Sequence, residues 1–421
     1  MKKIEIPRDI AGEIVEAARK GESPSRGLEY VMVGRLKENR AYINAFEYVE
    51  NGGYKVKLIK GEFGSGKTTE LKHNCSMARE RGYVTMFAKL SPSMKLYSTN
   101  GSSLALWKAL VEGMSPSLDG ILDAFLDKAK KETPEEGDIL KSVEGLLRDV
   151  KGVDESHFRK IVYKWCRGRL EGNTALCDSA IRWLKGEYNR CDTAREELGK
   201  DVQAILSDGN QNAPKWYSIL KCMVQFSVLS GFKAVAVYLD ETYNLYKIDN
   251  SRVRDKNYEM LHSIITDNIP YCQLMFTGTE QSVRDRRKGL YSYGALASRL
   301  ETAVEEDENR VDRYQTVDTI CPLKPEDILM LLLILKRAYD SYYDREFPVT
   351  KQDVLQVVND YLESTTFRKY LTTRSAMLRF SGIMNKMIDH PELSFTDCRI
   401  QTPVIAEPNN SRDIQSKIKE L

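Results

Sequence analysis

Residues 61–68 of the 421-residue chain read Gly-Glu-Phe-Gly-Ser-Gly-Lys-Thr, which fits the pattern G-x-x-x-x-G-K-T. The stretch before this motif, residues 54–59, alternates as a strand does, and residues 69–81 after it suit a helix. Glycines allow the backbone to curl so that successive N–H groups point inward, and such a nest holds a phosphate group. The strand–loop–helix unit therefore predicts a site for a nucleoside triphosphate.

Two side chains of this loop carry the expected chemistry. Lys67 brings a mobile positive charge to the β- and γ-phosphate oxygens, and the hydroxyl of Thr68 is a ligand for Mg²⁺. The helix that begins at Lys67 directs the positive end of its dipole at the same phosphates. We expect the following residues to contact the nucleotide: Gly61, Glu62, Phe63, Gly64, Ser65, Gly66, Lys67, Thr68 and Thr69.

Composition narrows the class of protein. The chain has 42% hydrophobic and 29% charged residues, which is typical of a folded globular protein, and its length suggests two or three packed units. A formal net charge of +2 gives no overall basic field that would attract nucleic acid or an anionic membrane. We expect a cytoplasmic protein without membrane contact, because its start lacks the apolar region of a signal peptide and its longest apolar run, residues 328–335, is too short to span a membrane.

The pattern of apolar residues divides the chain into regions. Almost no strand pattern occurs between about residue 102 and residue 230, and the stretch after Pro325 is helical as well. We expect N-terminal helices and the first part of an α/β core over 1–101, a helical insertion over 102–212, the second part of the core over 213–321, a helical or winged-helix-like lid over 322–390, and a polar tail over 391–421.

Two carboxylates follow a strand that the sequence predicts to be buried. Residues 234–239 are apolar throughout, as in a parallel strand covered on both faces, and Asp240 and Glu241 come directly after them. Ligands bind at the carboxyl ends of such strands. We expect Asp240 to be an outer-sphere partner of Mg²⁺, and Glu241 to orient and polarise a water molecule for attack on the γ-phosphate.

Four further side chains are candidates for contact with the γ-phosphate. Thr277 and Thr279 follow the next strand, and the sequence does not decide which of them touches the phosphate or the attacking water. Arg299 could reach the nucleotide of a neighbouring subunit, and Arg374, after an expected N-cap at Thr373, could close over the nucleotide from the lid. The alternatives are ordinary turn chemistry for the threonines and surface salt bridges for the arginines.

Cationic residues and two tryptophans crowd together in the expected insertion. One interpretation is a solvated helical surface with the tryptophans in the core, and the other is a contact surface for a partner protein or nucleic acid. These residues are Arg159, Lys160, Lys164, Trp165, Arg167, Arg169, Arg182, Trp183, Lys185 and Arg190.

In this order, the motifs resemble those of the AAA+ superfamily, particularly its branch near the origin-recognition initiators. The chain is more similar still to the ATP-binding proteins of the BREX phage-defence systems. The loop Gly-Glu-(Phe/Tyr)-Gly-Ser-Gly-Lys, the Walker B sequence Leu-Asp-Glu, the Thr-Gly-Thr and the Ala-Leu-Ala-x-Arg-Leu of that family correspond to residues 61–67, 239–241, 277–279 and 295–300. Its Thr-Pro-Arg sensor-2 start corresponds to residues 372–374, which lack the proline.

The resemblance, which covers about residues 30–100 and 213–385, implies both a fold and an activity. It implies an AAA+ core of five parallel strands in the order 5-1-4-3-2, with the fifth strand near residues 315–320, and it assigns Gly34 and Arg35 to the adenine side of the site. It further implies Mg²⁺-dependent hydrolysis of ATP to ADP and phosphate in a prokaryotic anti-phage system, together with partner proteins, DNA or an ATP-dependent homo-oligomer.

Two alternative functions stay open at this point. One is a nucleotide-switched scaffold with negligible turnover, which recruits partner proteins through the insertion. The other is a DNA-bound initiator or a transposition-type regulator, for which the sequence offers the basic residues Arg368, Lys369, Arg374, Arg379 and Lys386. Steady-state phosphate release tests the first alternative, and the salt dependence of DNA binding tests the second.

Overall fold

The structure, a computed structural model, describes residues 5–134, 138–152, 154–202, 204–206, 215–300, 317–319, 323–363 and 371–404. The chain forms two compact units. The first, here the sheet unit, comprises Ala41–Lys60 and Asn74–Asp318. The second, here the P-loop unit, comprises Met1–Arg40, Gly61–His73 and Thr319–Leu421.

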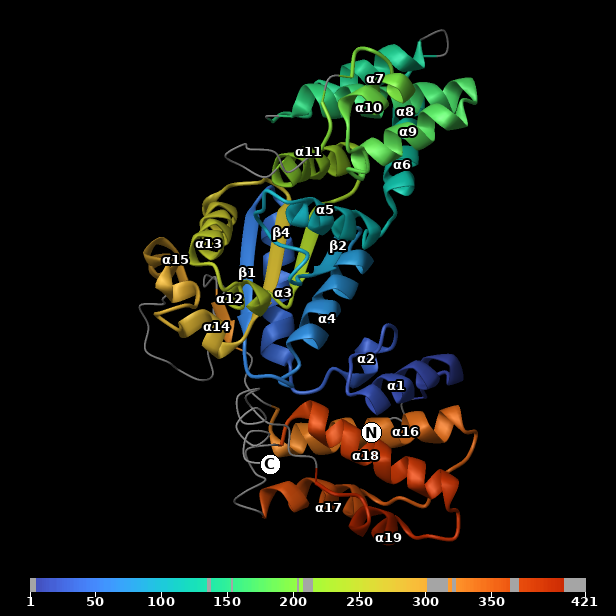
Figure 1. Cartoon of the computed structure of the whole chain (residues 1–421). Helices are drawn as coiled ribbons and strands as arrows, with labels where there is room; N and C mark the ends of the chain where they lie inside the picture. The colour runs from blue at the N-terminus through green and yellow to red at the C-terminus, as the bar shows by residue number, and fades with distance from the viewer. Residues whose placement is uncertain are drawn as a thin grey trace. The chain divides into compact units, whose positions relative to one another are not determined.

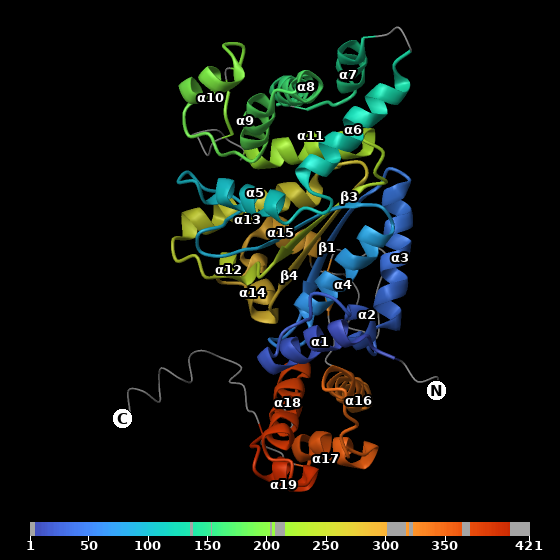
Figure 2. The same cartoon turned by 90° about the vertical axis from the view of Figure 1, so that its right-hand side faces the viewer.

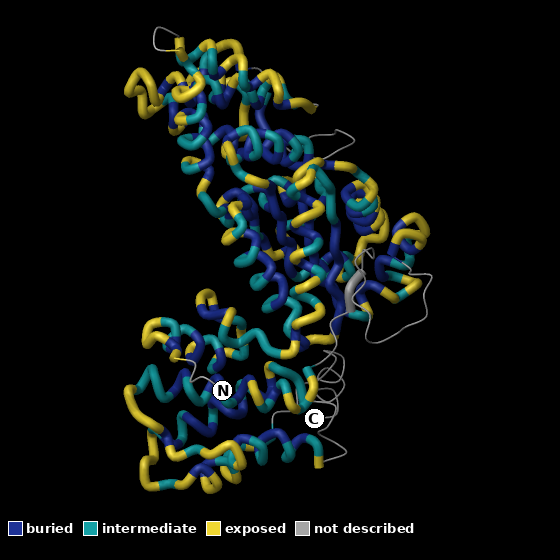
Figure 3. The backbone as a smooth tube through the Cα atoms, turned by 180° about the vertical axis from the view of Figure 1, so that it is seen from behind, coloured by how far each residue is buried: buried dark blue, intermediate teal, exposed yellow. Residues whose placement is uncertain are grey.

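Four parallel strands form the centre of the sheet unit (Figure 1). They are β1 (Tyr54–Lys60), β2 (Val84–Lys89), β3 (Val235–Asp240) and β4 (Cys272–Gly278), in the order β2-β3-β4-β1. Every residue of β3 and β4 is buried (Figure 3), which explains why their sequences are almost continuously apolar. The register pairs Lys60 with Gly278 and Lys89 with Asp240, so the four carboxyl ends meet at one edge of the sheet.

The α/β fold with a parallel sheet is confirmed, and so is the order 1-4-3-2 of its first four strands. The strand order continues beyond β1 with the three-residue β5 (Val317–Thr319), which lies within the segment where we expect a fifth strand. The remaining residues of that segment, 315, 316 and 320, lie outside the described residues. The residues that pair with one another are established for the four strands β1 to β4, and the described sheet is therefore four-stranded in its register.

Helices cover both faces of the sheet (Figure 2). The hydroxyl of Tyr54 on β1 bonds to the carbonyl of Ile264 on α13, and the hydroxyl of Tyr238 on β3 bonds to Asn74 on α4. Two helices, α3 (Leu36–Glu50) and α4 (Lys67–Glu80), extend over both units. The other helices of the sheet unit are α5 (Ser102–Glu112), α6 (Leu118–Glu132), α7 (Ile139–Leu147), α8 (Glu155–Glu171), α9 (Thr174–Leu184), α10 (Cys191–Leu198), α11 (Lys215–Leu229), α12 (Tyr243–Tyr246), α13 (Ser251–Thr266), α14 (Glu280–Arg284), η1 (Leu290–Ser292) and α15 (Gly294–Leu300).

The helices α6 to α10 lie beyond the amino ends of the strands, opposite the edge where α12 and α14 begin (Figures 1 and 2). One hydrophobic cluster joins this helical part to the sheet, because it contains Leu58 and Val237 of the strands as well as Phe158 and Trp183 of the helices. The helical part is therefore built onto the sheet through a continuous core, at the end away from Asp240.

The P-loop unit combines the start and the end of the chain. Its other helices are α1 (Arg8–Lys20), α2 (Leu28–Val31), α16 (Pro325–Tyr342), α17 (Lys351–Leu362), α18 (Thr373–Asp389) and α19 (Phe395–Ile400). Ile14 and Val15 of α1 belong to the same core as residues of α16 and α18. The guanidinium of Arg19 adds hydrogen bonds to the Tyr343 hydroxyl (2.6 Å) and to Asn385 Oδ1 (3.0 Å), which fix α1 against these helices.

The short helix α19 differs from our expectation of a tail without core-forming residues from 391 onward. Phe395 and Cys398, three positions apart on α19, are buried in the core of the P-loop unit. A six-residue helix offers only two such positions, which is too few for a periodic signal in the sequence.

None of the helices in the described ranges combines the length and the apolar character that crossing a membrane requires.

Candidate functional site

The loop between β1 and α4 has the backbone that its glycines permit. It starts at Gly61, directly after the last residue of β1, and α4 begins at Lys67. Gly64 and Gly66 have φ angles of +77° and +94°, in the left-handed region where a side chain is strained. A β-carbon on Gly64 would also lie only 3.0 Å from Oγ1 of Thr372. Glycine at position 64 therefore serves both the turn and the close approach of the C-terminal helices.

Lys67 is held within this loop. Its Nζ donates hydrogen bonds to the carbonyl oxygens of Gly61 (2.8 Å) and Glu62 (2.7 Å). The same ammonium group lies 5.6 Å from the ring centroid of Phe63, whose side chain is about half exposed. The positive charge of Lys67 is therefore held against the backbone carbonyls of the loop itself.

Arg35 connects three segments of the P-loop unit. Its side chain is only 8% exposed, and its guanidinium forms ion pairs with Glu38 (3.2 Å) and Glu70 (3.8 Å). It also donates a hydrogen bond to the carbonyl oxygen of Ser65 (3.4 Å). We expected Gly34 and Arg35 on the adenine side. The side chain of Arg35 is directed at the backbone of the phosphate loop and at α4, and the placement of Gly34 and Arg35 on the adenine side stays a prediction.

Gly34 lies against the first turn of α16. Its φ angle is +70°, and a β-carbon there would lie 2.6 Å from Oδ2 of Asp327, in the first turn of α16. Gly34 thus allows the segment before α3 to pass close to the C-terminal helices.

Arg374 also contacts the phosphate loop. A β-carbon on Gly64 would lie 3.5 Å from Cβ of Arg374, and one on Gly21 would lie 2.9 Å from its Cγ. The stem of Arg374 thus runs between the loop and the C-terminal end of α1. The expected N-cap at Thr373 is wrong by one residue: Thr372 caps α18 by accepting a hydrogen bond from the N–H of Ser375, because a capping box needs its partner three residues on.

In the sheet unit, Asp240, Glu241 and Thr277 form one hydrogen-bonded group at the carboxyl edge. The Thr277 hydroxyl donates to Oδ1 of Asp240 (2.7 Å) and accepts from the backbone N–H of Glu241 (3.0 Å). The same N–H also donates to Oδ1 of Asp240 (2.9 Å). Glu241 has a φ angle of +58°, which is uncommon for a residue with a side chain, and these bonds hold it there.

The environment of this group is electrically negative. Asp240 is almost completely buried. Burial, and then the negative charges of Glu241 and Asp240, raise the pKa of Tyr243, which begins α12. A cation in this place would be favoured by the same charges.

Thr279 has a different position from Thr277. Its hydroxyl accepts a hydrogen bond from the N–H of Ser282 (3.0 Å) and caps α14, while Ser282 Oγ accepts one from the N–H of Thr279 (2.9 Å). The hydroxyl of Thr279 is thus used in a capping box, whereas that of Thr277 faces a carboxylate. Hydrogen-bond partners separate two residues that the sequence leaves equivalent.

Arg299 is exposed near the end of α15. Of the basic residues considered for DNA, Arg379 is buried and pairs with Asp360 (2.6 Å), and Lys386 donates to the carbonyl of Gln401 (2.6 Å). Arg368 and Lys369 lie outside the described residues.

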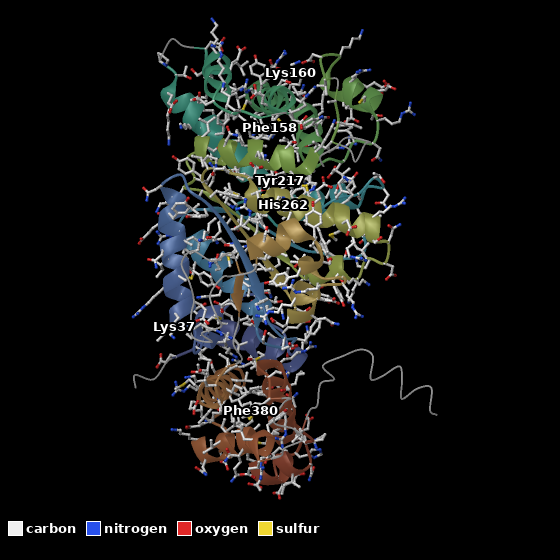
Figure 4. All side chains as sticks on the ribbon, turned by 90° about the vertical axis from the view of Figure 1, so that its left-hand side faces the viewer. Lys37, Phe158, Lys160, Tyr217, His262 and Phe380 are labelled. Carbon is white, nitrogen blue, oxygen red and sulfur yellow. The ribbon has the colours of Figure 1, made fainter. Side chains whose placement is uncertain are left out.

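Several cations of the insertion form ion pairs within the insertion itself. Arg167 pairs with Glu171 (2.7 Å), Arg169 with Asp123 (2.9 Å) and Arg182 with Glu197 (2.7 Å). Both tryptophans are buried. Phe158 is buried inside this part and Lys160 is exposed on the same helix (Figure 4). These contacts fit the interpretation as a solvated surface over an aromatic core.

Sequence reasoning missed Ser23. Its hydroxyl lies 2.6 Å from Oγ1 of Thr69, and its carbonyl accepts a hydrogen bond from Nζ of Lys72 (3.1 Å). The Gly-Ser-Pro composition of residues 21–25 indicates only a break after a helix, and nothing in it points to a partner so far along the chain.

The residues of the loop fit a triphosphate. The Ser65 hydroxyl is buried, and among the described residues no partner for it occurs. Such a hydroxyl costs about 1–3 kcal/mol unless a ligand satisfies it. Mg²⁺ prefers oxygen ligands of the kind that the Thr68 hydroxyl and the Asp240 carboxylate provide.

Comparison with known proteins gives the family of the chain. A sequence model of the family described as BREX system ATP-binding protein BrxC/D matches residues 6–401. No curated protein sequence matches.

Among solved structures, the ORC2 protein of Aeropyrum pernix, in ADPNP–ADP complexes, is similar with 11% identity and a TM-score of 0.41, over 90% of this chain and 70% of that one. A Walker-type ATPase of Pyrococcus abyssi is similar with 10% identity and a TM-score of 0.36, over 92% of this chain and 75% of that one. The family match spans nearly the whole chain, including the loop, the strand-end carboxylates and the C-terminal helices, and the chain therefore belongs to the BREX system ATP-binding protein BrxC/D family.

Proposed function

We propose that this protein is a Mg²⁺-dependent ATPase of a BREX-type phage-defence system. The observation that carries the proposal is the hydrogen-bonded group of Asp240, Glu241 and Thr277, at the same sheet edge where β1 passes directly into the Gly61–Lys67 loop. A phosphate-binding loop alone would support a nucleotide-binding protein. A carboxylate held in a fixed conformation at the carboxyl edge of the sheet supports hydrolysis as well.

Each residue of the site has a role in this proposal. The N–H groups of the loop and the ammonium of Lys67 would bind the β- and γ-phosphates, and the Ser65 hydroxyl would donate to a phosphate oxygen. Thr68 and Asp240 would hold Mg²⁺, which when bound neutralises charge on the phosphates. Glu241 would orient a water molecule in line with the β–γ bond and accept its proton, and ADP and phosphate would leave.

Thr277 is the residue we assign to the γ-phosphate side in preference to Thr279. Its hydroxyl already links Asp240 to the backbone of Glu241, so any change at the carboxylates would reach it directly. Thr279 is committed to capping α14. This assignment rests on hydrogen-bond partners and not on sequence position.

We infer that hydrolysis changes the contacts of Arg374 and Arg299, and with them the geometry of the lid and of a homo-oligomer. The helical insertion would then be the part that meets other proteins of the defence system.

Measurement of nucleotide binding and phosphate release tests the proposal. We expect wild-type protein to release phosphate from ATP in the presence of Mg²⁺ and to stop when EDTA is added. Lys67→Ala should lose nucleotide binding, whereas Glu241→Gln should bind ATP but turn it over at least about 100-fold more slowly. Full turnover by Glu241→Gln would remove this residue from its role. Binding without any turnover in the wild type would instead favour the scaffold function.

A further inference from the structure

The connection between α1 and α2 is fastened to the first turns of α4. The hydroxyls of Ser23 and Thr69 lie 2.6 Å apart, and either can be the donor. Three residues further along α4, Nζ of Lys72 donates to the backbone carbonyl of Ser23 at 3.1 Å. Both Ser23 groups therefore engage one face of α4, because positions i and i+3 lie on the same side of a helix.

A pair of hydroxyls that shares one hydrogen bond retains one hydrogen for another acceptor. If Ser23 donates to Thr69, the hydrogen of Thr69 is available, and an anion beside Thr69 would favour this arrangement. Hydrogen bonds in such a chain also strengthen each other. The pair can therefore direct one O–H toward an anionic ligand of α4.

Thr69 stands where such a ligand would be. It is the third residue of α4, and the first bond that closes the helix runs from the N–H of Glu70 to the carbonyl of Gly66 (2.9 Å). The N–H groups before Glu70 belong to the turn that lacks partners within the helix. The buried Ser65 hydroxyl, unpartnered among the described residues, is an independent sign of a ligand at this loop.

The other end of the connection is fixed as well. Gly21 ends α1 in the left-handed conformation (φ +64°), and its N–H bonds to carbonyls in the last turn. A β-carbon there would lie 2.9 Å from Cγ and 3.0 Å from Nε of Arg374. Ser23 is thus held two residues from a close contact with Arg374, so its position toward Thr69 is set in advance.

We propose that Ser23 is a positioning residue, which orients the Thr69 hydroxyl to donate to a phosphate of the bound nucleotide. The inference rests on the proposed nucleotide site and adds to it a residue from outside the loop. It also gives the N-terminal helix a direct connection to the phosphates, through Gly21 and Ser23.

A double-mutant cycle on ATP affinity tests this role in the full-length protein. Ser23→Ala should weaken ATP binding about three- to ten-fold, as the loss of one orienting hydrogen bond does. Thr69→Val should weaken it by at least as much, and Ser23→Ala combined with Thr69→Val should weaken it no further than Thr69→Val alone. Ser23→Thr, which keeps a hydroxyl, should bind ATP nearly as the wild type does. Ser25→Ala is the matched control, because Ser25 is exposed in the same connection.

The outcomes separate this inference from the proposed function. Additive effects of Ser23→Ala and Thr69→Val would overturn it, and so would a lower melting temperature of Ser23→Ala with unchanged ATP affinity. If Ser23→Ala does not fold, the test is the ATP affinity of Ser23→Thr. An affinity as weak as that of Thr69→Val would overturn the inference, and an affinity close to that of the wild type would support it. A wild-type protein that binds no ATP would refute the proposed function together with this inference.

Discussion

The hydroxyl of Thr277 donates a 2.7 Å hydrogen bond to Oδ1 of Asp240, and it accepts one from the N–H of the next residue, Glu241. One hydroxyl on β4 therefore fixes both the carboxylate at the end of β3 and the backbone that aims the second carboxylate. Because Glu241 has a positive φ angle, its side chain depends on these two bonds for its direction. Thr277 therefore positions both carboxylates through hydrogen bonds of its single hydroxyl.

Removal of the Thr277 hydroxyl should therefore slow hydrolysis. Thr277→Val preserves the shape of the side chain, and we expect kcat to fall about 10- to 100-fold while ATP affinity changes little, as for a lost partner of a metal-binding or catalytic carboxylate. Steady-state phosphate release and equilibrium ATP binding measure the two quantities. Thr279→Ala is the matched comparison: it removes the cap of α14, so its main effect should be about 1 kcal/mol on the free energy of unfolding. A larger fall in kcat for Thr279→Ala than for Thr277→Val would reverse the assignment.

Loss of the buried guanidinium of Arg35 should destabilise the protein. Arg35→Ala leaves the buried Glu70 without this ion pair and the Ser65 carbonyl without its hydrogen bond, at a cost of roughly 2–3 kcal/mol in the free energy of unfolding. Urea denaturation measures this change. Arg26→Ala is the control, since Arg26 pairs with Glu13 at the surface and its loss should leave the unfolding midpoint close to that of the wild type. Equal midpoints for the two variants would contradict the structural role of Arg35.

The elements that could be predicted from the sequence are those with local signals. The apolar run before Asp240 has the length and composition of a strand covered on both faces, and β3 is such a strand. The glycines and lysine of the loop fix where β1 stops and where α4 begins, at Lys67. These signals predict where β1 and β3 end, and therefore at which edge of the sheet Asp240 and Thr277 meet.

Contacts between distant segments could not be predicted in the same way. The apolar face of α1, with Ile14 and Val15, shows that this helix is covered but not that α16 and α18 cover it. Ser23 and Thr69 are 46 positions apart in the sequence, and neither residue type indicates which residue it contacts. Arg35 could be placed near the nucleotide by resemblance, yet the direction of its side chain depends on Glu38 and Glu70, which only the fold brings together.

Acid should weaken one identified ion pair of the sheet unit. The hydrogen bond from Arg81 holds the pKa of Glu50 below its ordinary value of 4.5. A lowered carboxyl pKa means that the folded state favours the charged form, so the pair stabilises the fold above about pH 4.5 and loses this effect as the pH falls through the lowered pKa. Glu50→Gln should therefore lower the melting temperature at pH 7. It should also narrow the difference between the melting temperatures at pH 7 and at pH 4. The exposed Glu47 supplies the control variant, Glu47→Gln, which should keep the wild-type difference.

The exposed position of Arg299 leads to a test for action between subunits. If Arg299 contacts the γ-phosphate of a neighbouring molecule, Arg299→Ala should bind ATP but hydrolyse it at least about 100-fold more slowly, as for the loss of an arginine that stabilises transition-state charge. Lys67→Ala binds no ATP yet keeps Arg299, so mixing the two inactive variants should restore part of the phosphate release. Arg287→Ala, another exposed arginine of the sheet unit, should hydrolyse ATP at close to the wild-type rate. Complementation by Arg287→Ala in place of Arg299→Ala would move the role to Arg287, and a mixture with Arg299→Ala that stays inactive at every ratio would argue that Arg299 does not act across an interface.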